Sequence, residues 1–211
     1  MDELATPEKL SEKKLRLWLF NPFHYVAGGK ALAIGAGCII ASGLVAALSN
    51  SRLDGVIDFH SGPPVQNPAW LPVSDGFLAW VLMGVLLLIG GKVISRSRVR
   101  VLDVFGTQAL ARFPHLITAL FALIPGARRY SQNLQVKLLA SGAPLQAYPM
   151  DGFLFILTMI VAVLMTVWMV VLMYRAFAVS CNVSGGKAVG VFIAALILGE
   201  VISKVALIYL F

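Results

Sequence analysis

Apolar residues gather in four long segments along the chain, and shorter polar stretches separate them. The apolar segments are residues 31–48, 77–94, 153–174 and 188–211. A bilayer core about 30 Å thick needs roughly 20 apolar residues to be crossed by a helix. The segments hold few charges: Lys92 lies near the end of the second, where its side chain can extend to the headgroups, and Glu200 and Lys204 lie in the last. This pattern predicts four membrane-spanning helices.

A fifth apolar segment, residues 106–124, gives a weaker signal. Arg112, Pro114 and His115 interrupt it, and Pro125-Gly126 ends it. It is either a polar span that neighbouring helices shield from lipid, or a helix that enters and leaves the membrane on one side. The positions of Lys and Arg do not decide this. With a cytoplasmic N-terminus, 12 lie inside and 4 outside for five spans, against 13 and 3 for four spans.

Three Gly-Gly-Lys sequences favour five spans. They begin at Gly28, Gly90 and Gly185, next to the ends of predicted helices. Glycine lets the backbone turn at a helix end, and lysine then anchors that end at the headgroups. All three lysines face the cytoplasm only if the chain crosses the membrane five times. We therefore predict an all-α membrane protein, a bundle of five transmembrane helices in which the third span is marginal.

The composition is typical of a membrane protein, and it limits the kinds of partner that we expect. The mean hydropathy is +0.85, and 59% of residues are hydrophobic and 13% charged, whereas soluble domains are about half apolar and a quarter charged. The net charge is +7. Nucleic acid is not an expected partner, because the basic residues adjoin apolar spans, a pattern typical of contacts with anionic lipid headgroups. We predict such contacts for Arg96, Arg98 and Arg100, which follow the second span.

The first 24 residues are rich in charge and form a separate cytoplasmic segment in this interpretation. Thr6 followed by Pro7 is typical of a helix start. Leu10, Leu17 and Trp18 can share one face of that helix. We expect an amphipathic helix along the cytoplasmic membrane surface, followed by a transmembrane domain over residues 25–211.

Glu200 and Lys204 are the most informative polar residues within a span. A lone charge near the middle of a span costs at least about 2.5 kcal/mol. Glutamate four residues before lysine on a helix is the favourable order for an ion pair. Arg112 and His115 of the third segment are candidates to join the pair. Two interpretations of Glu200 and Lys204 remain: an ion pair that fixes helix packing, and a proton or ion relay.

Small residues four positions apart predict where helices approach closely in lipid. The last segment carries two such stripes, with Gly190 and Ala194 on one and Ala195 and Gly199 on the other. Ala33 and Gly37 form a similar stripe in the first segment. We therefore expect the first and last helices to pack at the centre of the bundle. The bulky residues of segment 153–174 predict a lipid-facing helix.

The polar segment 50–75 is the longest external loop that we expect. It contains Asp54, Asp58 and His60, whose carboxylate and imidazole groups are ligands for divalent metals. Their spacing matches no known metal motif, and acidic residues in loops are usually solvated. The sequence also lacks the zinc-protease, P-loop and nucleophile-elbow motifs. We expect no metal, no cofactor and no enzymatic activity.

Three short motifs resemble those of the Yip family, the Ypt/Rab-interacting membrane proteins, and most closely its bacterial branch. Before the first span, Leu19-Phe20-Asn21-Pro22-Phe23 resembles the family's Asp-Leu-Tyr-Gly-Pro-Phe motif, with Trp18 in place of the Asp and Asn21 in place of the Gly. Tyr174-Arg175-Ala176-Phe177, followed by a Gly-Lys and a last helix, resembles bacterial members, and Phe105-Gly106 resembles a second family motif. The resemblance covers about residues 18–211.

The resemblance implies five spans, a cytoplasmic N-terminus and a bacterial inner-membrane location. Eukaryotic members act in vesicle traffic and bind Rab GTPases, an activity that we do not carry over to this chain. We expect a non-enzymatic protein that acts in membrane organisation or trafficking-like scaffolding. Its expected partners are membrane lipids with anionic headgroups and a homo-oligomer or another membrane protein. The alternative is a small transporter or channel subunit that uses the Glu200 and Lys204 pair.

Overall fold

The computed structural model describes residues 15, 17–61, 68–139 and 148–210, and these form an almost entirely helical bundle. The helices and strands are η1 (Pro22–His24), α2 (Gly28–Leu48), β1 (Ser51–Arg52), β2 (His60–Ser61), α3 (Trp70–Ile94), α4 (Val101–Leu110), α5 (Pro114–Ala122), α6 (Pro125–Leu139), α7 (Pro149–Cys181) and α8 (Gly185–Leu210). The predicted all-α membrane fold is confirmed. Four helices are long and apolar enough to cross a membrane, or five spans with the bent helix pair that follows α3.

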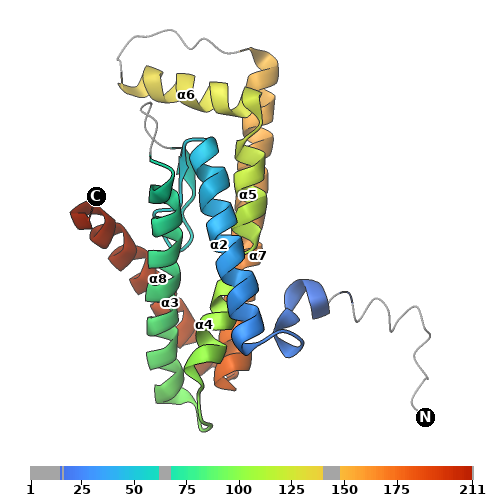
Figure 1. Cartoon of the computed structure of the whole chain (residues 1–211), viewed down its shortest axis with the longest axis vertical. Coiled ribbons are helices and arrows are strands. Elements are labelled where there is room, and N and C mark those ends of the chain that lie inside the picture. The colour runs from blue at the N-terminus through green and yellow to red at the C-terminus, as the bar shows by residue number, and fades with distance from the viewer. Residues whose placement is uncertain (1–14, 16, 62–67, 140–147, 211) are drawn as a thin grey trace.

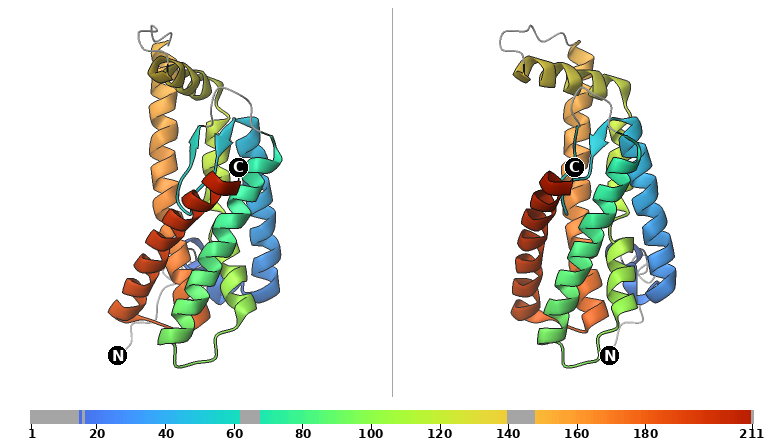
Figure 2. Two further views of the ribbon diagram at one scale, coloured as in Figure 1. Left: turned by 90° about the vertical axis from the view of Figure 1, so that its left-hand side faces the viewer. Right: turned by 60° about the vertical axis from the view of Figure 1, so that its left-hand side comes forward.

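The chain runs up and down between two ends of the bundle (Figure 1). We call the end that carries residues 95–100 and 182–184 the lower face, and the end where α2 stops and α6 lies the upper face. Five elements pass between these ends in turn: α2, α3, the α4–α5 pair, α7 and α8. Residues 17–26 lie near the lower face, and α8 leans outward as it rises (Figures 1 and 2).

The third crossing consists of α4 and α5, which run in line beside α2 and α7 (Figure 1). Backbone hydrogen bonds continue across the three residues between them, for example from Arg112 N to Ala109 O at 3.2 Å and from His115 N to Arg112 O at 3.0 Å. This pair packs against α2, α3 and α7. The chain therefore follows the shielded-span alternative, because protein and not lipid surrounds the polar residues of this segment.

Side chains of the third crossing find polar partners on neighbouring helices. Gln108 Nε2 donates to Met173 O at 2.9 Å, and the Thr107 and Ser180 hydroxyls lie 2.7 Å apart. Thr107 and Gln108 are both buried. Polar groups in a bundle interior need such partners because no water is present there to replace them. The same contacts attach α4 to the lower half of α7.

After α5 the chain bends sharply. The segment Val101–Ala122 and α6 meet at 84°, so that α6 lies across the upper face (Figure 1). Arg129 holds α6 to the start of α7 through two hydrogen bonds to the Asp151 carboxylate, at 2.8 and 3.0 Å. With 33 residues, α7 is about 50 Å long, which exceeds the bilayer core. It therefore reaches beyond the other spans to meet α6.

Helices α2 and α4 pack closely against each other at Gly35. A side chain at Gly35 would collide with the backbone of Ala109 and Leu110. The predicted stripe of Ala33 and Gly37 is wrong as a packing surface, because both residues are exposed. Gly35 and Gly37 are two residues apart, which places them about 200° apart around the helix axis. Only one of them can therefore face α4.

The last helix packs mainly on α3. Of its two predicted stripes, Ala195 and Gly199 are buried, whereas Gly190 and Ala194 are exposed. Neighbouring stripes point about 100° apart, so a single flat contact can bury only one. The expectation that the first and last helices form the centre of the bundle is wrong, since the α4–α5 pair takes that place.

The fourth span divides into two halves. Its first half faces lipid as predicted, with exposed side chains that include Phe153, Ile156 and Ile160. The prediction is wrong for the end of the segment, where Met169, Leu172 and Met173 are fully buried, and Ala176 and Phe177 just beyond it are buried as well. These residues belong, with Met83 and Leu87 of α3, to the main core.

The start of α3 differs from the sequence prediction. Helix α3 begins at Trp70, inside the segment expected to be a loop, because Pro72 falls in its first turn, where proline is tolerated. The helix predicted from Thr6 lies mostly outside the described residues. Residues 17–20 are helical, and Trp168 Nε1 of α7 donates to Leu19 O at 3.0 Å. Phe23 of the family-like motif is buried, with only 2% of its surface exposed.

Candidate functional site: a charged cluster between the first loop and the last helix

The loop between α2 and α3 turns back into the upper half of the bundle. Its two short strands pair antiparallel, with Ser51 opposite Ser61 and Arg52 opposite His60, and they lie level with the end of α8 in both views of Figure 2. Leu53 and Val56 are buried, with 2% and 0% of their surface exposed. These apolar side chains explain why the loop enters the bundle, since burial removes their surface from water.

The tip of the loop rests on α8. Val56 packs over Gly199, where a Cβ atom would lie 3.2 Å from Val56 Cγ2. One residue on, the Glu200 carboxylate accepts a hydrogen bond from Ile57 N at 3.0 Å. Gly55 lies against the same carboxylate, and a side chain at Gly55 would collide with both Glu200 oxygens. Glu200 therefore supplies the acceptor that the buried loop backbone requires.

Lys204, one helical turn after Glu200, binds the acidic residues of the loop. Its ammonium group donates a hydrogen bond to Asp58 Oδ2. It also lies 3.8 Å from Asp54 Oδ1 and 3.8 Å from Glu200 Oε1. The predicted Glu200 and Lys204 pair is thus present, but each member has its closest contact with the loop. The pair anchors the loop to α8.

His60 completes the cluster from strand β2. Its Nδ1 lies 3.3 Å from Asp54 Oδ1 and 3.8 Å from Asp58 Oδ2. The nearby carboxylates of Asp54 and Asp58 raise the pKa of His60 to about 9. The nearby His60 imidazole, followed by the hydrogen bond from Lys204, holds the pKa of Asp58 below its usual range. His60 therefore carries a positive charge at neutral pH.

The raised pKa of His60 predicts that stability falls in mild alkali. The pKa is above the unfolded value of 6.5, so the contribution of the charged imidazole is complete below pH 6.5 and is lost as the pH rises through about 9. We expect the melting temperature in detergent to decline over this window. The variant His60→Gln should show a flatter profile. An identical decline in this variant would assign the effect to another group.

The charges of the cluster sum to one negative charge, because Asp54, Asp58 and Glu200 face only Lys204 and the charged His60. Arg112 supplies a compensating positive charge in the bundle interior, and its charge is attracted by Glu200. Arg112 and His115 are both buried, at 3% and 4% exposure, and line a small cavity with Leu53 of the loop. Among the described residues, neither Nε nor Nη2 of Arg112 has a hydrogen-bond partner.

Asp54, Asp58 and His60 offer ligand atoms that lie within 4.8 Å of one another. Carboxylate and imidazole groups of this kind suit a divalent metal. However, the Lys204 ammonium already binds Asp58 and lies close to Asp54. A metal ion would have to displace this lysine, so the arrangement favours an internal ion-pair network.

A second ion pair fixes the other side of the loop. Arg52 Nε and Nη2 donate to the two oxygens of Asp75 at 2.7 and 3.1 Å. Asp75 is fully buried within α3. A guanidinium bound to a carboxylate through two parallel hydrogen bonds is a strong and directional contact. The loop is therefore attached to α3 by Arg52 and to α8 by the charged cluster.

Sequence reasoning identified all five ionisable members of the cluster but placed them in two separate groups. It missed Gly55 and the backbone of Ile57, which connect those groups. The apolar run of Leu53, Val56 and Ile57 within a polar loop was the available signal. The predicted headgroup contacts Arg96, Arg98 and Arg100 are far from this site and lie exposed at the lower face.

Comparisons of this chain with known protein families, with curated proteins and with solved structures give no match.

Proposed function

We propose that this multi-pass membrane protein is a non-enzymatic organiser of the membrane, of the Yip type, that acts through lipid and protein contacts at both faces. The observation that carries the proposal is the 84° bend that lays α6 across the upper face. Arg128, Arg129 and Lys137 give this helix a basic character suited to a headgroup region.

Contacts of the same kind are available at the lower face. Leu15, Trp18, Leu19 and Phe20 of the N-terminal segment are exposed. The Trp18 ring stacks on Tyr25 with a centroid distance of 5.2 Å, and tryptophan is enriched at membrane surfaces. The exposed Arg96, Arg98 and Arg100 lie at this face as well. A cytoplasmic lower face would bring these arginines to the anionic leaflet.

The charged cluster supports a scaffolding role, because its carboxylates are bound by Lys204 and His60 of the same chain. Glu200 accepts a loop amide and Lys204 donates to a loop carboxylate. Both contacts close the loop onto α8, as expected for a fixed membrane domain that presents constant surfaces to lipid and partners.

Vesicle morphology tests the proposal. We expect the protein, reconstituted into vesicles of phosphatidylethanolamine and phosphatidylglycerol, to change vesicle size or shape in electron micrographs. The double variant Trp18→Ser and Phe20→Ser should weaken this effect, because it removes apolar surface that can enter the headgroup region. Tyr209→Ser, which alters an exposed aromatic residue on α8, serves as the control. Vesicles indistinguishable from protein-free vesicles would contradict the proposal.

The second candidate is a small transporter or channel subunit. It is favoured by the clustering of five ionisable side chains beside a span, since charged residues at membrane depth often mark ion or proton paths. Under this alternative, Glu200 would exchange a proton or cation and the loop would move from α8. The Glu200 variants described in the Discussion separate the two functions.

A further inference from the structure

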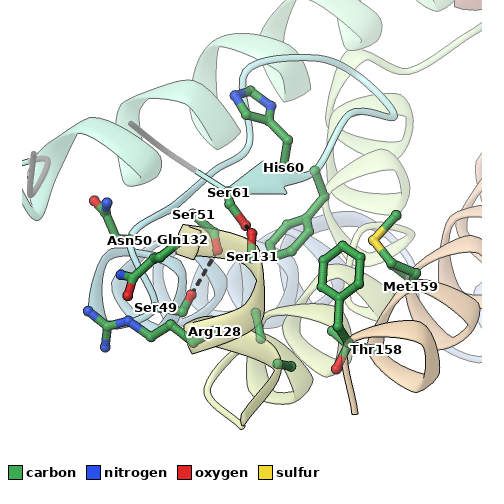
Figure 3. Close-up of a pocket in the computed structure, with 15 residues that line it drawn as sticks. Ser49, Asn50, Ser51, His60, Ser61, Arg128, Ser131, Gln132, Thr158 and Met159 are labelled. Carbon is green, nitrogen blue, oxygen red and sulfur yellow. Dashed lines mark hydrogen bonds between the residues drawn. The ribbon is translucent and has the colours of Figure 1, made fainter. Parts of the chain in front are cut away.

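A cavity lies near the upper face, between the first loop, α6 and α7 (Figure 3). One end is polar: Figure 3 places Ser49, Asn50, Gln132 and Arg128 together on the left. The other end is formed by α7: Met159 and Thr158 lie on the right of Figure 3, and Phe155 and Ala162 of the same helix also line the cavity. The Thr158 hydroxyl donates to Leu154 O within the helix, so this end is mainly apolar. The lining thus changes from polar to apolar along the cavity, which fits an amphiphile better than a uniformly polar solute.

The apolar end belongs to the lipid-facing half of α7. Phe155, Met159 and Ala162 line the cavity, while their neighbours Ile156 and Ile160 on the same helix are 59% and 53% exposed. A molecule that enters at this end comes directly from the lipid around α7. The occupant with the readiest access is therefore a membrane lipid.

The size of the cavity fits part of a lipid chain. About 50 Å³ is available to the centre of a water-sized group, which is room for roughly four such groups, since one needs about 10–15 Å³. This volume holds a short stretch of an acyl chain or the glycerol region. The rest of the chain would lie along the exposed surface of α7.

The charges at the polar end suit an anion. The lining includes two basic residues, Arg128 and His60, and no acidic residue. His60 shares its charge with Asp54 and Asp58 on its other side. Arg128 is more accessible: one of its N–H groups donates to Leu48 O at 3.0 Å, and a guanidinium has five N–H groups. Arginine is suited to phosphate because its planar group can bind two oxygens at once.

We propose that this cavity binds one phospholipid, with the upper part of an acyl chain between α6 and α7 and an anionic headgroup at Arg128. The site is separate from the arginines of the lower face, and the inference does not depend on the proposed function. Bound lipid would connect α6 to the first loop through residues of both.

Native mass spectrometry of the full chain with phosphatidylglycerol tests the site. We expect the wild-type protein to retain one phosphatidylglycerol after weakly attached lipids are released. Ala162→Phe fills the apolar end and should lower the retained fraction at least tenfold, a change of about 1.4 kcal/mol. Ile160→Phe adds the same ring on the exposed side of α7 and should leave retention unchanged.

The headgroup is tested separately. Arg128→Gln should reduce the preference for phosphatidylglycerol over phosphatidylcholine about fivefold, since one basic residue near the surface contributes about 1 kcal/mol. Lys137→Gln removes a charge from the same helix outside the cavity and is the matched control. Arg128 is only half-buried, so this variant stays informative if Ala162→Phe fails to fold. Equal retention in the wild type, Ala162→Phe and Arg128→Gln would overturn the proposal, and so would equal losses in the two control variants.

Discussion

Replacing Gly35 with leucine is expected to destabilise the bundle strongly. A side chain at Gly35 collides with the backbone of Ala109 and Leu110, which cannot move without separating α2 from α4. Forcing extra atoms into a packed interface costs about 1–3 kcal/mol, and more where the backbone must shift. We expect a cost at the upper end of this range, seen as a large fall in the melting temperature in detergent.

The control for this prediction is two residues away. A Cβ atom at Gly37 has nothing within 4 Å, so Gly37→Leu places the same side chain against lipid and should change stability by less than about 0.5 kcal/mol. Equal melting temperatures for the two variants would show that α2 does not meet α4 through Gly35. The reverse order would show that α2 faces α4 with its opposite side.

Replacing Glu200 with alanine is expected to release the first loop from α8. The change removes the acceptor of the Ile57 amide and one carboxylate close to Lys204. Loss of a half-buried hydrogen bond between a backbone amide and a carboxylate costs about 1.5–3 kcal/mol. Hydrogen exchange followed by mass spectrometry should show faster exchange at residues 53–58. Unchanged exchange there would contradict the assigned role of Glu200.

Two further variants separate the hydrogen bond from the charge. Glu200→Gln keeps an oxygen for the Ile57 amide and should preserve slow exchange in the loop. Lys204→Met removes the cation that binds Asp58 and should increase exchange nearest to that residue. If the wild-type protein conducts protons or cations into liposomes and the folded Glu200→Gln protein does not, the transporter alternative is favoured. Equal flux from both proteins and from empty liposomes favours scaffolding.

The third span shows why hydropathy ranks the helices of this bundle in a misleading order. Segment 106–124 is the weakest span by sequence because it carries Arg112 and His115, yet it lies at the centre. Its polar side chains are tolerated there because α2, α3 and α7 surround it and supply partners such as Met173 O and the Ser180 hydroxyl. Hydropathy measures the cost of contact with lipid, and this segment has little such contact.

The charged cluster shows a different limit. Asp54, Asp58 and His60 lie more than 130 residues before Glu200 and Lys204, and no periodicity connects a loop to a distant helix. The resemblance to the Yip family concerns short motifs at Leu19–Phe23 and near Tyr174, and it stays a prediction. Neither kind of signal contains the contact between Gly55 and Glu200, which depends on how deeply the loop enters the bundle.

Several properties of this protein follow from local pattern alone: a multi-pass helical membrane domain, the approximate limits of its long spans, and the order of glutamate before lysine in α8. Each depends on the transfer of a continuous segment to lipid or on spacing within one helix, so neighbouring residues are sufficient to establish it. Other properties required the packed bundle: which small residues meet another helix, why Arg112 is buried, and where the first loop rests. These depend on surfaces that come from distant parts of the chain and that gain stability only when they bury one another.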